Sequence, residues 1–94
     1  MVRYEYDKAG LSIQELKTES DYEFHFRVQD DNVLRRLKQL RSEVENNDDL
    51  TDVHFATQPG SVYLAAVRHD FRMEFVLLMF KYGIVDAVRR ERNE

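Results

Sequence analysis

Residues 71–82, FRMEFVLLMFKY, decide the fold, because the domain has one topology if they form a helix and another if they form a strand. Their pattern fits both. A helix capped by Asp70 would end at Gly83, a residue type suited to the position just after a helix. Its core stripe would consist of Phe71, Phe75, Leu78, Met79 and Tyr82. A strand would instead place on one face Phe71, Met73, Phe75, Leu77 and Met79. The helix gives the better topology and the strand gives the cleaner alternation, so both readings stay open.

The residues before this segment contain a clearer strand, a helix and a hairpin. Residues 22–28, YEFHFRV, alternate with period two and place one apolar face on a core. Residues 32–44 have helical periodicity, and Asp30 and Asp31 favour a helix start there and an end near Asn46 or Asn47. Residues 51–57 and 62–67 flank a Gln-Pro-Gly-Ser turn, which predicts a β-hairpin.

The first 21 residues are predicted to form an N-terminal β-hairpin. Residues 2–6 alternate apolar and charged side chains and stop at Ala9-Gly10. Residues 11–17 are ambiguous, since Leu11 and Ile13 suit a strand whereas Ser12 and Glu15 have capping-box spacing. We favour the strand, which makes residues 1–21 an extension of a core that spans residues 22–91.

These elements predict one α+β domain over residues 1–94, a two-layer sandwich of an antiparallel sheet and two helices. If residues 71–82 are a helix and residues 84–90 a strand, the core order is strand-helix-strand-strand-helix-strand, which is the ferredoxin-like order. The alternative is a mainly antiparallel sheet in which residues 71–82 are a strand and a short helix ends the chain.

Composition places this domain in the cytoplasm and argues against several classes. The chain has no cysteine, so disulfides and thiolate chemistry are excluded. Two acids within the first seven residues argue against a signal peptide, and the longest apolar run, residues 75–80, is too short to cross a membrane. The net charge is −4, and no segment has the positive balance typical of nucleic-acid binding.

Nothing in the sequence predicts an enzyme, a cofactor or a metal site. The three histidines, His25, His54 and His69, are scattered, and the strands of the first two should be separated by another strand. The segment RVQDD at residues 27–31 lacks the glycines of a phosphate-binding loop, and its two carboxylates would repel a phosphate.

The residues that best indicate function lie within residues 71–82. As a helix, the segment has a second apolar stripe opposite the core stripe: Met73, Val76, Leu77 and Phe80. A small two-layer protein cannot bury both sides of a helix, so this stripe predicts an association surface. The alternative is that the rest of the chain covers it, with the segment either a helix capped by the N-terminal hairpin or a central strand covered on both faces. We therefore expect a non-catalytic interaction or regulatory module that binds a protein partner, most simply as a homodimer.

RNA binding is the alternative. The open sheet face would display Tyr63 and Arg27 together with His25, His54 and Arg89, and a basic strip would run along residues 35–41. The residues expected to contact nucleic acid are Arg27, Arg35, Arg36, Lys38, Arg41 and Tyr63.

Overall fold

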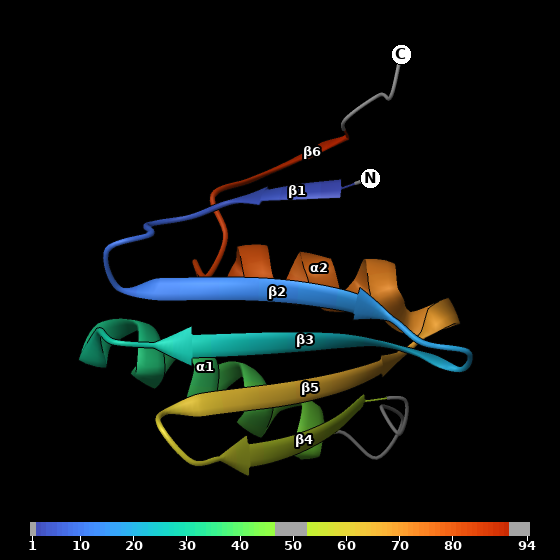
Figure 1. The fold of residues 1–94 in the computed structure, drawn as a ribbon, viewed down its shortest axis with the longest axis horizontal. Coiled ribbons are helices and arrows are strands. Elements are labelled where there is room, and N and C mark those ends of the chain that lie inside the picture. The colour runs from blue at the N-terminus through green and yellow to red at the C-terminus, as the bar shows by residue number, and fades with distance from the viewer. Residues whose placement is uncertain (1, 47–52, 91–94) are drawn as a thin grey trace.

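The computed structural model describes residues 2–46 and 53–90, and a four-stranded antiparallel sheet forms one of its two layers (Figure 1). Both helices lie behind one face of this sheet, and the other face is uncovered in the described part of the chain. In chain order the elements are β1 (Val2–Glu5), β2 (Leu11–Lys17), β3 (Asp21–Val28), α1 (Asp31–Glu45), β4 (Val53–Gln58), β5 (Val62–Arg68), the 3₁₀ turn η1 (His69–Phe71), α2 (Arg72–Lys81) and β6 (Ala87–Arg90). The α+β class with two helices is therefore confirmed.

The strand order of the main sheet, β2-β3-β5-β4, is not ferredoxin-like. The ferredoxin-like order would place the last strand beside β3, but β2 occupies that position and pairs with β3 along seven residues. Thr18 closes the short turn between these strands, since its backbone N–H donates to the Asp21 carbonyl over 2.8 Å and its hydroxyl accepts from the Asp21 N–H over 2.9 Å. A hairpin with so short a connection loses little chain entropy, which favours β2 over the distant β6 as the partner of β3.

The predicted N-terminal hairpin is likewise wrong, because β1 pairs with β6 rather than with β2. These two strands form a separate antiparallel ribbon from Val2↔Arg90 to Glu5↔Ala87. The Asp86 N–H donates to the Glu5 carbonyl over 2.7 Å and extends the ribbon by one contact. Residues 11–17 are a strand, as favoured, but they belong to the main sheet. Tyr4 and Leu11 are both buried in the common core, so residues 2–21 are part of the core domain and not a detached extension.

Helix α1 and the β4–β5 hairpin form where the local patterns predict them. The Asp30 side chain accepts hydrogen bonds from the backbone N–H groups of Asn32 and Val33, at 2.7 and 3.3 Å, and caps α1. The helix ends at Asn46 as its C-cap, whereas Asn47 lies outside the described residues. Strands β4 and β5 pair from Val53↔Val67 to Gln58↔Val62, and positions 51 and 52 of the predicted strand also lie outside the described residues.

Residues 72–81 form helix α2, which settles the main ambiguity of the sequence and excludes the strand. The helix start differs from the prediction: Asp70 lies in η1, and Phe71 precedes α2 without a side-chain cap. The helix ends just before Gly83, as predicted. Gly83 adopts φ +69°, its N–H donates to the Phe80 carbonyl over 3.0 Å, and the Ile84 N–H donates to the Met79 carbonyl over 2.8 Å. This is a Schellman motif, in which only glycine takes the left-handed position at low cost.

Replacing Gly83 with alanine is expected to destabilise the protein by about 1 to 2 kcal/mol, because alanine pays the full cost of the left-handed backbone. Steric crowding adds little, since a Cβ at Gly83 would lie 3.6 Å from the flexible Arg36 guanidinium. Urea denaturation measures the loss. Gly83→Asn serves as the control and should lose less, because asparagine tolerates this conformation. Equal losses in the two variants would contradict the explanation.

The core lies between the sheet and the two helices. The fully buried side chains include Phe24 and Phe26 of β3, Leu40 of α1, and Phe75 and Met79 of α2. The Phe75 ring centroid lies 5.0 Å from that of Phe24 and 6.3 Å from that of Phe55, so one side chain joins α2 to two strands. Neither helix has the length and apolar character needed to cross a membrane.

Candidate interaction surfaces

Three large apolar side chains lie exposed along one side of α2. Met73, Leu77 and Phe80 have 63%, 58% and 38% of their surface accessible, and their i, i+4, i+7 spacing aligns them in one stripe, which we call the α2 face. Of the described residues, Leu16 of β2 is the other large hydrophobic residue that is exposed. Exposed apolar residues are common singly, but a row of three on one helix is typical of a binding surface.

The fourth residue of the predicted stripe, Val76, is buried and does not belong to the α2 face. It retains 6% of its surface and lies one turn after Arg72, whose guanidinium contacts the Tyr4 hydroxyl of β1 at 3.3 Å. Residues four apart share one side of a helix. The first strand of the chain therefore covers one side of α2, and this side includes Val76.

A polar cluster anchors the first turn of α2 to three strands. The Arg72 guanidinium donates to both carboxylate oxygens of Glu15, at 2.6 and 3.0 Å, and the Tyr4 hydroxyl donates to the same carboxylate at 3.0 Å. Arg72 also lies 4.6 Å from the centre of the Tyr22 ring. Burial, followed by the charge of Glu15, raises the pKa of Tyr4 well above its ordinary value, so this hydroxyl keeps its proton at neutral pH.

A second polar contact anchors the last turn of α2 to α1. Lys81 forms an ion pair with Glu43, and the Tyr82 hydroxyl donates to the same carboxylate at 2.7 Å. The hydrogen bond from Lys81, followed by that from Tyr82, lowers the pKa of Glu43. With both ends of the helix held, the α2 face is presented on a rigid element.

A groove of about 280 Å³ runs between α1 and the β4 side of the sheet, and we call it the α1–β4 groove. The Arg41 guanidinium lies across it, donating to the Thr57 hydroxyl at 3.3 Å with its central carbon 5.7 Å from the centre of the Phe55 ring. The same guanidinium donates to Glu45 at 2.9 Å. The lining residues are Leu34, Leu37, Lys38, Arg41, Phe55, Ala56, Thr57 and Tyr63.

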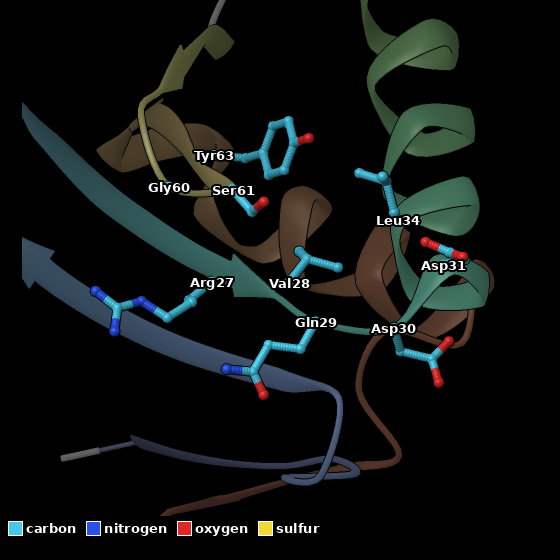
Figure 2. A pocket seen from close by; sticks show the side chains of 9 residues that line it. All are labelled: Arg27, Val28, Gln29, Asp30, Asp31, Leu34, Gly60, Ser61 and Tyr63. Carbon is cyan, nitrogen blue, oxygen red and sulfur yellow. The ribbon is translucent and has the colours of Figure 1, made fainter.

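A wider pocket of about 660 Å³ adjoins this groove at the start of α1 and shares Leu34 and Tyr63 with it. Figure 2 shows these two side chains facing each other across the hollow, while the side chains of Arg27 and Asp30 point away from it. The Asp30 carboxylate already occupies the first free amides of α1, the groups that would otherwise bind an anion. The pocket is therefore an open hollow with a mostly polar lining and no convergent set of catalytic groups.

The six residues predicted to contact nucleic acid do not lie on one surface. Tyr63 lies opposite Phe26 in the β3–β5 pairing, so its side chain is on the helix side of the sheet and not on the open face with Arg27. Arg35 donates to Asn32 at 3.0 Å, and Arg36 donates to the Gly83 carbonyl at 3.4 Å on another side of α1. Lys38, Arg41 and Tyr63 do share the α1–β4 groove.

Three further residues were expected on the open face of the sheet, and the structure places two of them, His25 and His54, on the main sheet. Arg89 forms an ion pair with Glu5 at 2.7 Å in the β1–β6 ribbon, away from the main sheet. His25 lies on the open face and contacts Glu23 at 3.3 Å, while the strand of His54 is separated from it by β5, as expected. Within residues 2–46 and 53–90, no group of three histidine, cysteine or acidic side chains is placed to hold a metal ion.

Comparisons with protein-family models, curated proteins and solved structures found no match to this chain. The α2 face and the α1–β4 groove are thus the features that bear on function.

Proposed function

We propose that this protein is a non-catalytic interaction module that self-associates as a twofold homodimer through the α2 face. The observation that carries the proposal is the exposure of Met73, Leu77 and Phe80 on a helix anchored at both ends. A rigid apolar surface loses little conformational freedom when a partner covers it, so its burial translates into binding.

A second copy fits this surface by charge as well as by apolarity. If two α2 helices pack antiparallel with Leu77 at the centre, Met73 and Phe80 of each copy extend the apolar seam on either side. Glu74 and Lys81 flank the seam at positions seven residues apart, and both are exposed. In an antiparallel pair these positions face each other, so Glu74 of each copy meets Lys81 of the other.

The expected dimer is weak. Stable interfaces bury about 800 Å² on each partner, more than three side chains on two helical turns can supply alone. Lys81 must also share its charge between Glu43 of its own chain and Glu74 of the second copy. We therefore expect a dissociation constant of about 10 to 100 µM, at the weak end of specific association.

Replacing Leu77 with glutamate is expected to abolish the dimer, because it places two like charges at the centre of the apolar seam. Sedimentation velocity from about 5 µM to about 1 mM should show the wild type moving from monomer to dimer and the variant remaining monomeric. Gln39→Glu adds the same charge on the exposed surface of α1 and should dimerise like the wild type.

Glu74→Lys tests the antiparallel arrangement, because it replaces both attractive contacts across the seam by repulsive ones and should weaken the dimer about tenfold. A wild type that stays monomeric at about 1 mM would refute the proposal. So would a Leu77→Glu variant that dimerises normally.

A further inference from the structure

Strand β4 forms one edge of the main sheet and lacks the features that usually block strand addition. Among the described elements it pairs with β5 alone. Its sequence, VHFATQ, contains no lysine, no acid and no proline. Proteins normally protect an exposed edge with such residues or by covering it. The opposite edge strand, β2, is partly covered, because its Ile13 N–H donates to the Tyr6 hydroxyl at 3.0 Å.

The hydrogen-bond pattern shows which backbone groups of β4 point outward. The Val28 N–H donates to the Ser61 carbonyl at 3.2 Å, so the bonds between β3 and β5 fall on Ser61 and on alternate residues after it. The intervening residues of β5 form their hydrogen bonds with β4 instead, and their partners there are His54, Ala56 and Gln58. The N–H and C=O groups of Phe55 and Thr57 therefore point away from β5 and are available to another strand.

The α1–β4 groove lies beside this edge and suits the side chains of an added strand. An added strand would direct alternate side chains toward α1, into the space lined by Leu37, Phe55 and Tyr63. Leu37 is buried, and Phe55 and Tyr63 are half-buried, which leaves an apolar floor rather than a free aromatic surface for stacking bases. An edge strand beside a groove is a peptide-binding arrangement.

The charge of the groove indicates the kind of peptide. Its lining includes the cations Lys38 and Arg41 and no carboxylate, although Arg41 shares its charge with Glu45. Arg35 and Lys38 line a shallow continuation along α1, in which Asp31 is the acid. We propose that β4 and the α1–β4 groove bind an extended acidic peptide segment of a protein partner, which adds to the main sheet as a fifth strand. This site is separate from the α2 face.

A fluorescently labelled peptide of alternating glutamate and valine is the probe for this proposal. Fluorescence anisotropy should show binding with a dissociation constant of about 100 µM or tighter. Two further peptides carry N-methyl groups on alternate residues, one on the odd and one on the even positions. One of the two should bind at least about tenfold more weakly than the unmodified peptide, because it loses the N–H donors that pair with β4. A lysine-valine peptide should not bind, because its charges oppose Lys38 and Arg41.

The protein variants locate the site. Lys38→Gln combined with Arg41→Gln should weaken binding about tenfold by removing both cations of the groove. Arg27→Gln combined with Arg36→Gln removes the same charge elsewhere and should bind normally. Peptide binding should also slow amide hydrogen exchange at Phe55 and Thr57, but leave that at His54 and Ala56 unchanged, because the latter pair are already bonded to β5. The Leu77→Glu variant should bind the peptide like the wild type, which separates this site from the proposed dimer.

Failure of the peptide to bind at about 1 mM would overturn the proposal. Binding without slowed exchange at Phe55 and Thr57 would also overturn it, since the peptide would not be adding to β4. Tighter binding of a single-stranded RNA oligonucleotide that displaces the peptide and depends on Lys38 and Arg41 would assign the groove to nucleic acid instead.

Discussion

Replacing Phe75 with alanine is expected to destabilise the protein by about 3 to 5 kcal/mol, a large share of the total stability of about 5 to 10 kcal/mol that a domain of this size has. The Phe75 ring is fully buried and contacts Phe24 of β3 and Phe55 of β4. Its removal leaves a cavity that the anchored α2 helix cannot close by moving inward. Thermal and urea denaturation followed by circular dichroism measure the loss.

Leu77→Ala is the matched control, because Leu77 lies on the same helix with 58% of its surface exposed. Measured at a protein concentration where the wild type is monomeric, it should change stability by less than about 0.5 kcal/mol. If Phe75→Ala proves too unstable to purify, Phe75→Leu should still fold and lose about 1 to 2 kcal/mol, since it removes less volume. A loss for Phe75→Ala as small as that for Leu77→Ala would show that α2 packs differently.

Replacing Arg72 with leucine is expected to cost about 2 to 3 kcal/mol and to lower the melting temperature by about 10 °C or more. The Glu15 side chain keeps only 15% of its surface in solvent, so without Arg72 its carboxylate is left largely buried and without a cation. The expected loss of stability is smaller than for a fully buried ion pair, because Arg72 itself retains 20% of its side-chain surface. Urea denaturation at neutral pH measures it.

Adding Glu15→Leu and Tyr4→Phe to Arg72→Leu should restore most of the lost stability, to within about 1 kcal/mol of the wild type. The three substitutions remove the whole polar cluster and leave apolar groups of similar size, so no buried charge remains. If the losses instead accumulate with each substitution, the cluster contributes net stability beyond the need to keep Glu15 paired.

The elements that depend on neighbours in the chain were predictable. The strand at residues 22–28, the helix after Asp30 and the hairpin at Pro59 and Gly60 follow from period, capping and turn chemistry, which act over a few residues. Gly83 correctly indicated the end of α2, because the left-handed backbone there is a local requirement. The prediction that Asp70 caps α2 was wrong, because residues 69–71 form a 3₁₀ turn before the helix.

The candidate surfaces were predictable only in part. Met73, Leu77 and Phe80 are exposed as their spacing suggests, but β1 covers the neighbouring side of α2 and buries Val76. The cluster around Glu15 had a weak signal in the sequence: Glu15 shares a face with Leu11 and Ile13 and breaks their apolar pattern. Its partner Arg72 lies 57 residues away, and no local rule connects them.

The amino-acid sequence was sufficient for the position of α1 and of most strands, since these depend on side-chain order within single elements. It left residues 71–82 open between a helix and a strand, and the packed structure decided for the helix. The tertiary structure alone determined which strands are neighbours: β2 rather than β6 beside β3, and β1 with β6 in a ribbon. The physical reason is that backbone hydrogen bonds are the same for every strand, so pairing depends on connection lengths and on which apolar faces meet. That pairing buries Val76 and places Tyr63 on the helix side of the sheet. Among the described elements it also makes β4 an edge strand beside a basic groove.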